Sequence, residues 1–314
     1  MKANSTKPPK RGARRRPWAV LVAISACSAQ ALLGAAQSQI RADESTAGAH
    51  QRQSEAGART DPIEFVVGNV EYLLVHEIAH LLISEKNIPI IGPVENAADY
   101  IATMALLLEE PLDPTQRDRA QRFLLAAAMA FSASWEAGTS KGAEIPYWGE
   151  HALSIQRYYQ IGCLLYGSDP AAFVRVPHAF GFSGERAQSC VTEYARASGA
   201  IEWVLQTYGR RPGDGPGAES EIVYEKAPTG VSTSVVQRLR SIELLERVIA
   251  RLHERFTLDR PFRLVIRSCG RPEAAWMPDR RELAICYELI DTLYRLGLGA
   301  APLVLDDARS SDQR

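Results

Sequence analysis

A five-residue segment, His76-Glu77-Ile78-Ala79-His80, constrains the fold of this 314-residue chain more than any other part. Residues four apart lie on the same face of an α-helix, so a helix here can aim both imidazoles at one point. The flanking residues 72–75 and 81–83 are apolar, which predicts that this helix is buried. Two histidines on a buried helix are therefore unlike residues of a solvent-exposed face. A shared metal ion would explain their position, although paired histidines also occur in protein cores.

The carboxylate within this segment suggests a catalytic rather than a structural metal. Glu77 follows the first histidine directly, so its side chain points beside a metal held by His76 and His80, where a general base for a metal-activated water belongs. A catalytic zinc takes three protein ligands and keeps a fourth position open. The sequence must therefore supply one further ligand.

Glu95 and Asp99 meet this requirement. Fourteen residues separate His80 from Glu95, enough for a turn and for a second helix, predicted over residues 95–109, to run back beside the first. Glu95 is then the third ligand. Asp99, one turn later on the same face, can accept the free N–H of a ligand histidine and fix its orientation. Alternatively, both acids only favour the positive end of the helix dipole.

These residues also carry a resemblance to known proteins. Glu-x-x-x-Asp following His-Glu-x-x-His resembles the arrangement in gluzincin peptidases of the thermolysin type. The wider pattern is similar to a bacterial family of "putative metallopeptidases". It runs through residues 65–76 and 95–99, resumes at residues 150–159 and Cys163, and ends in residues 268–270 and 284–289. The resemblance implies a zincin-like helical domain and a metal, but no substrate.

From this set we predict a zinc-dependent metallopeptidase that acts on a peptide or protein substrate. Zn²⁺ held by His76, His80 and Glu95 would activate water, and Glu77 would serve as its base. Two histidines and one carboxylate do not exclude iron, but the adjacent glutamate favours zinc. Two alternatives stay open: an exported, non-catalytic zinc-binding scaffold or partner-binding domain, and a zinc amidase that acts on a cell-wall substrate.

Stabilising the oxyanion of a tetrahedral intermediate requires a further donor. The candidates are His151 and the pair Arg157 and Tyr158, from a block that the resemblance covers. His151 can equally be a hydrogen-bonded residue at a helix start. For Tyr158, packing in the core is the competing interpretation.

The N-terminus has the pattern of an export signal. Residues 1–16 carry seven positive charges and no acid, and residues 17–40 carry no charge at all. A basic run before an apolar stretch with small residues is typical of a secretory signal, so we predict a signal peptide or lipoprotein signal over residues 1–40. Cys27 would carry the lipid, or an uncleaved helix would attach the protein to a membrane. The polar residues 41–61 are expected to form a disordered tether.

The rest of the chain is acidic. Without residues 1–16, 29 basic residues face 37 acidic ones, so a nucleic-acid partner is not expected. Besides Cys27 there are four cysteines, which in an oxidising extracytoplasmic compartment, periplasmic or extracellular, suggest two disulfides. Neighbouring predicted elements carry Cys163 with Cys190 and Cys269 with Cys286, and we predict those pairs. Four reduced, buried thiols are the alternative.

The predicted fold class is mainly α, with α+β character from a small β element near the C-terminus. One domain is expected over residues 62–300, with a flexible break at 209–231 and a disordered tail at 301–314. A short extended run is expected before the first helix. Two late strands are expected to form a hairpin, whose edge either borders the substrate-binding cleft or has only a structural role. The extended run spans residues 63–67; the helices are expected at 68–84, 95–109, 115–137, 151–166, 186–208 and 232–254, with a last one ending near 295; the hairpin joins 262–266 to 276–285.

Overall fold

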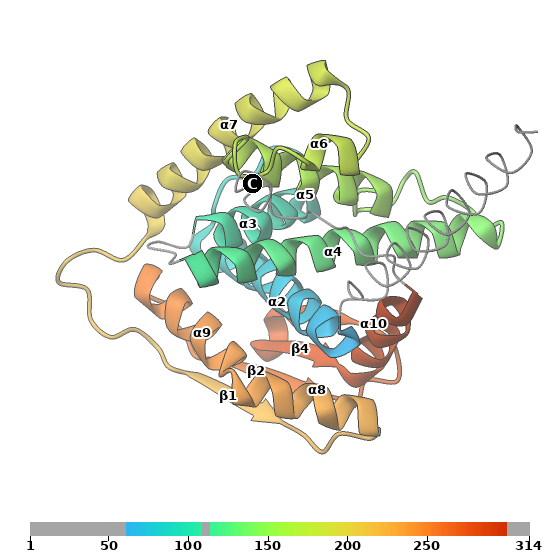
Figure 1. Cartoon of the computed structure of the whole chain (residues 1–314). Helices are drawn as coiled ribbons and strands as arrows, with labels where there is room; N and C mark the ends of the chain where they lie inside the picture. The colour runs from blue at the N-terminus through green and yellow to red at the C-terminus, as the bar shows by residue number, and fades with distance from the viewer. Residues whose placement is uncertain (1–60, 109–113, 300–314) are drawn as a thin grey trace, which may run out of the picture. The chain divides into compact units, whose positions relative to one another are not determined.

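Helix α2, Pro62–Lys86, is the central element of the structure and contacts both the helical layer and the β-sheet (Figure 1). The structure is a computed structural model that describes residues 61–108 and 114–299. The predicted leader 1–40, the tail 301–314 and all but the last residue of the tether 41–61 lie outside the described residues.

The chain begins α2 earlier than predicted. The extended run expected over residues 63–67 is wrong, because these residues form the first turns of the helix. Asp61 accepts a hydrogen bond from the backbone N–H of Ile63 at 2.9 Å, and Pro62 occupies the first turn. Both features favour a helix start and outweigh the β-propensity of the short apolar run. Asn87, in the left-handed conformation at φ 51°, ends the helix.

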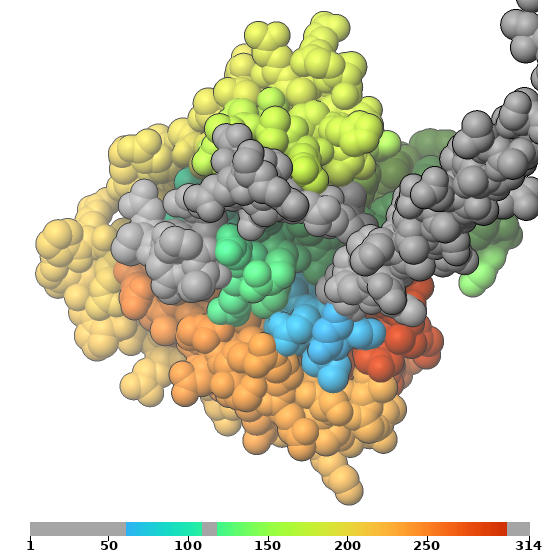
Figure 2. All heavy atoms as spheres, viewed as in Figure 1, coloured from blue at the N-terminus to red at the C-terminus, as the bar shows by residue number. Residues whose placement is uncertain are grey.

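By length and composition α2 could also cross a membrane. However, 83% of its most apolar window is buried inside the protein, as expected of a core helix. Its buried residues include Val66, Val70 and Leu74, each fully enclosed. The space-filling view shows the start of α2, in blue, reaching the surface beside the red segment α10, Tyr287–Gly299 (Figure 2).

A helical layer covers one side of α2. Helices α3 and α4 pack directly on α2, α5 packs on α4, and α7 packs on α5. The disulfide Cys163–Cys190 joins α5 to α7 as predicted. The bounds of these helices are α3 Val94–Leu107, α4 Pro114–Ser140, α5 Ser154–Ser168, the short α6 Val176–Ala179 and α7 Gly184–Tyr208.

A four-stranded sheet lies on the other side of α2, with the strand order β1-β2-β4-β3. Strands β1 and β2 are parallel, β2 and β4 are parallel, and β3 is antiparallel to β4. Strand β3 is therefore an edge, and it lies against α2. The disulfide Cys269–Cys286 ties the loop after β2 to the end of β4, as predicted. The strands are β1 Ser220–Tyr224, β2 Phe262–Arg267, β3 Ala274–Met277 and β4 Glu282–Cys286.

Two expectations about this part of the chain are corrected. The predicted break at 209–231 contains β1, which pairs with β2, a strand about forty residues later, so its stabilising partner is not local. The predicted hairpin between residues 262–266 and 276–285 does not form, because β2 and β4 are parallel and the hairpin joins β3 to β4.

The helix predicted over residues 232–254 is two helices, α8 Gly230–Ser241 and α9 Leu244–Arg255. Glu243 between them has a left-handed backbone at φ 49°. Continuing α8 from buried Leu239 would place Glu246 in the core, because that position lies two turns further on the same face. The break instead buries Leu245. The fold class, mainly α with a small sheet near the C-terminus, is confirmed.

Two glycines provide a matched test of the packing between α5 and α7. A Cβ at Gly167 in α5 would lie 2.3 Å from the carbonyl oxygen of Cys190 in α7, whereas one at Gly199 in α7 would meet nothing within 4 Å. Gly167→Ala should destabilise the protein by about 1–3 kcal/mol, because the disulfide keeps the helices from separating. Gly199→Ala should stabilise it by roughly 0.5–1 kcal/mol through helix propensity. Urea unfolding measures both, and equal effects of the two variants would contradict the close approach.

Candidate metal centre

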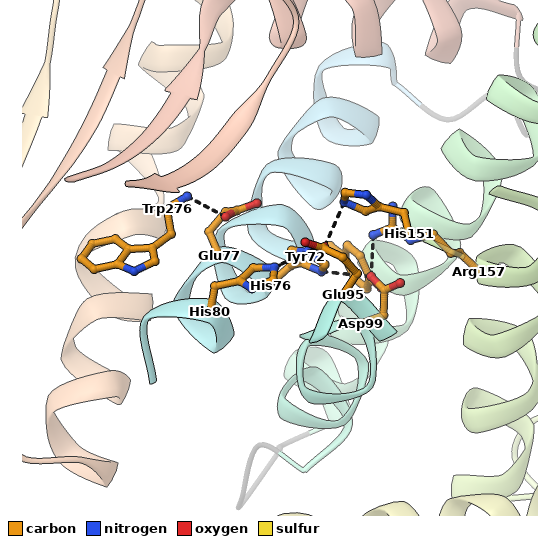
Figure 3. Close-up of polar contacts among 9 residues, drawn as sticks. All are labelled: Tyr72, His76, Glu77, His80, Glu95, Asp99, His151, Arg157 and Trp276. Atoms are coloured by element: carbon orange, nitrogen blue, oxygen red, sulfur yellow. Dashed lines mark hydrogen bonds and ion pairs between the residues drawn. The ribbon is translucent and has the colours of Figure 1, made fainter. Parts of the chain in front are cut away.

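Three side-chain atoms from α2 and α3 that could bind a metal converge at one point (Figure 3). Nε2 of His76 lies 3.1 Å from Nε2 of His80, and each of these nitrogens lies 3.2 Å from Oε2 of Glu95. The two histidines share one face of α2 because they are four residues apart. The turn at residues 87–93 returns the chain so that Glu95, in the first turn of α3, faces them.

These separations fit a metal ion. Ligand atoms 2.0–2.2 Å from a tetrahedral zinc lie about 3.3 Å from one another. The three measured separations are 3.1, 3.2 and 3.2 Å. The donor set of two imidazole nitrogens and one carboxylate oxygen is one that zinc accepts and that leaves a fourth position free.

The hydrogen bonding of His76 also favours a cation at this point. Its Nδ1 lies 3.0 Å from Oδ1 of Asp99, a fully buried carboxylate. Burial alone would raise the pKa of Asp99, but the hydrogen bonds from His76 and Arg157 hold it below its ordinary value. Nδ1 of His76 therefore donates, and in the neutral ring Nε2 presents a lone pair toward His80 and Glu95. Converging lone pairs repel unless a proton or a metal ion lies between them.

The charges around the point favour a positive species. Burial disfavours a charged His76, but hydrogen bonds to Asp99 and Glu95 outweigh it and raise the pKa of His76 to about 9. The hydrogen bond from His76 lowers the pKa of Glu95 to about 2, against the effect of burial. The site thus stabilises positive charge at the place where a divalent ion would bind.

Asp99 is itself held by two further residues. The hydroxyl of Tyr72 donates to Oδ1 of Asp99 at 3.2 Å, and Nη2 of Arg157 forms an ion pair with the same oxygen. The guanidinium of Arg157 also lies 4.0 Å from the ring centroid of Phe131. A buried carboxylate needs such partners, since an unpaired charge in the core is costly. Together they fix the acceptor that orients His76.

Glu77 lies beside the three ligand atoms and not among them. Its Oε2 accepts a hydrogen bond of 2.7 Å from the backbone N–H of Trp276 in β3. Burial raises the pKa of Glu77 to about 7, although the neighbouring His76 and this hydrogen bond act in the opposite direction. A carboxylate with a pKa near neutrality can both take and return a proton at physiological pH.

His151 borders the same point from the segment that precedes α5. Its Nε2 lies 2.9 Å from Oε2 of Glu95, and its ring stacks parallel to that of His76 with centroids 6.4 Å apart. One ligand atom each from His76, Glu95 and His151 fall within 4.8 Å of one another. The side chain of His151 is 56% exposed, so it reaches the centre from the solvent side.

The structure does not bring Tyr158 to this point, and its prediction as a catalytic residue is corrected. Its ring stacks on Phe180 with centroids 4.5 Å apart, and the residue is 9% exposed. Helix periodicity explains the difference, because adjacent residues of α5 point in different directions. Arg157 faces Asp99, whereas Tyr158 faces the aromatic core.

Sequence reasoning missed three contributions to the site. Tyr72 precedes His76 by four residues, and this helical spacing was a signal that could have found it. The sequence offers Arg157 as a donor to the oxyanion, but the structure pairs it with Asp99. The backbone N–H of Trp276 reaches Glu77 from 199 residues away, and no local pattern announces such a contact.

Comparison with known proteins agrees with this geometry. Residues 35–205 and 224–300 match a protein family described as "Putative metallopeptidase". The chain belongs to this family. No curated protein and no solved structure matches it. For a member of this metallopeptidase family, a metal ion and a peptide or protein substrate are the expected partners, and the cluster of histidines and Glu95 is a candidate place for the metal.

Asp99→Asn tests the hydrogen bond that orients His76. The amide cannot carry the negative charge that favours the donor state of Nδ1, so metal affinity should fall about 10–100-fold. Competition with a chromophoric chelator measures that affinity, and Asp118→Asn on the exposed face of α4 is the matched control. An affinity within twofold of wild type, in a variant with an unchanged circular dichroism spectrum, would refute this role for Asp99.

Proposed function

We propose that this protein is an extracytoplasmic zinc metallopeptidase whose metal ligands are His76, His80 and Glu95. The observation that carries the proposal is the convergence of their three ligand atoms at separations of 3.1–3.2 Å, with Glu77 immediately outside the set. Zinc bound there would supply a Lewis acid that polarises a peptide carbonyl and acidifies water.

The remaining chemistry belongs to residues of the chain. Glu77 takes the proton of the attacking water and passes it to the leaving amine, a task that suits its pKa of about 7. His151, on the solvent side of Glu95, donates a hydrogen bond to the oxyanion that develops on the substrate. Asp99 orients His76 and does not touch the substrate.

The edge strand β3 supports a peptide as the substrate. Trp276 directs its backbone N–H away from β4, toward Glu77, so the edge of β3 that does not pair with β4 faces the general base. An extended peptide can pair with such an edge through its own backbone. This arrangement favours peptide-bond hydrolysis over a role as a zinc-containing scaffold, which has no need for a strand edge beside a buried glutamate.

Two disulfides support a location outside the cytoplasm. Both Cys163–Cys190 and Cys269–Cys286 are bonded, and disulfides persist in oxidising compartments. The basic and apolar segment over residues 1–40 would direct the chain there, as a cleaved signal, a lipoprotein signal at Cys27 or a retained anchor.

Metal analysis of the purified protein tests the ligand set. Wild type should bind about one zinc per chain, and His80→Ala and Glu95→Ala should each lose it, because two remaining ligands hold zinc poorly. His178→Ala, at an exposed histidine on α6, should keep the metal. Elemental analysis that detects zinc and iron together also distinguishes the two metals. If the wild-type protein bound no metal even with added zinc, the proposal of a zinc-dependent enzyme would be wrong.

Glu77→Gln separates catalysis from metal binding. The variant should retain zinc but lose at least about 100-fold in peptide hydrolysis, since the amide cannot accept the proton of water. Cleavage of a peptide library, followed by mass spectrometry, measures this loss, with Glu202→Gln on the exposed face of α7 as the control. Full turnover by zinc-loaded Glu77→Gln would show that another group is the base. A zinc-loaded wild type that cleaves no peptide would favour a scaffold or a non-peptide substrate.

A further inference from the structure

The face of α2 opposite the metal centre borders a separate cavity of about 460 Å³. Glu71, Val75, Ile78 and Leu82 recur every three or four residues and so form one stripe along α2. The ligand histidines point roughly half a turn away from this stripe, so the cavity is separated from the metal by the helix itself. Helices α3, α4, α7 and α9 complete its walls.

The cavity walls are predominantly apolar. Ile101 and Ala105 come from α3, Val204 from α7 and Val248 from α9, with Phe256 directly after α9. Among the described residues that line the cavity, every polar side chain is an arginine or a glutamate. Small-molecule sites commonly combine apolar walls with a few polar groups in volumes of about 300–1,000 Å³, and this cavity falls within that range.

The charged groups are unbalanced. Four arginines line the cavity against two glutamates, although the described chain is acidic overall. Glu71, which is 3% exposed, pairs with Arg119 at 3.2 Å and with Arg251 at 3.0 Å. Nη2 of Arg247 is buried and has no hydrogen-bond partner. A buried donor of this kind is costly unless a ligand satisfies it, and an anion does so best.

We propose that this cavity binds a long-chain carboxylate, a fatty acid, whose alkyl chain lies against the apolar walls and whose carboxylate accepts a hydrogen bond from Arg247. A peptide fits less well, because its backbone N–H and C=O groups would find no partners along apolar walls. The oxygen of an uncharged lipid could accept that hydrogen bond, but a carboxylate forms the stronger, charge-assisted bond with Nη2 of Arg247. The proposal depends neither on the metal nor on peptidase activity, since the cavity and the metal centre lie on opposite faces of α2.

Palmitate binding to the purified full-length protein, stripped of lipid by an organic resin, tests this site. Palmitate should displace a fluorescent fatty-acid probe saturably, at one site per chain, and hexadecanol should bind at least about tenfold more weakly because it lacks the charge. Arg247→Gln should weaken palmitate binding about tenfold and hexadecanol binding much less, because only palmitate forms the charge-assisted bond. Arg196→Gln, at an exposed arginine of α7, should change neither.

A second variant probes the walls. Ala105→Phe should fill the cavity and reduce the binding of both palmitate and hexadecanol. If that variant does not fold, the thermal unfolding of wild type decides, because a ligand of the native state raises Tm as its concentration rises. No saturable palmitate binding, no rise in Tm, or equal affinity of Arg247→Gln and wild type would overturn the proposal. Displacement of the probe by apolar peptides but not by palmitate would also overturn it.

Discussion

The hydrogen bond between Nδ1 of His76 and the buried carboxylate of Asp99 is the interaction on which the proposed metal centre depends. It sets the direction of Nε2, and therefore where His80 and Glu95 must lie for the three ligand atoms to meet. A carboxylate in the core is tolerated only with a cation nearby. Arg157 supplies that cation from α5, so three helices that are separate in the sequence are held in one arrangement by one buried charge.

The candidate ligands could be named from the sequence because their signals are local. His76 and His80 are one helical turn apart. Glu95 and Asp99 lie on the next helix, after one connecting loop, and are also one helical turn apart. What remained hidden depends on distant parts of the chain. The N–H of Trp276 that holds Glu77 is a backbone group, so residue identity carries no information about it. The prediction misplaces Tyr158 because apolar spacing identifies α5 as a helix without showing which of its faces meets α3.

The fold could likewise be predicted from the sequence only in part. The long helices and the two disulfides follow from apolar spacing and from the cysteine positions, whereas the errors concern short elements. Residues 63–67 have β-propensity, but Asp61 and Pro62 start a helix there. Strand β1 is stabilised by β2 and not by its own sequence. The break at Glu243 appears only when the buried positions before and after it are compared, because each half alone has an ordinary helical pattern.

The burial of α2 on nearly all sides determines which motions of the backbone can disrupt the site. Amide protons in a helix enclosed by both layers exchange with solvent only when the whole domain opens, so the backbone that carries His76 and His80 belongs to the most protected part of the protein. His151 stands on the exposed segment before α5, where local opening is expected to cost less than opening of the whole domain. The centre therefore combines a rigid half, which lasts as long as the fold, with a half that can fluctuate on a much faster timescale.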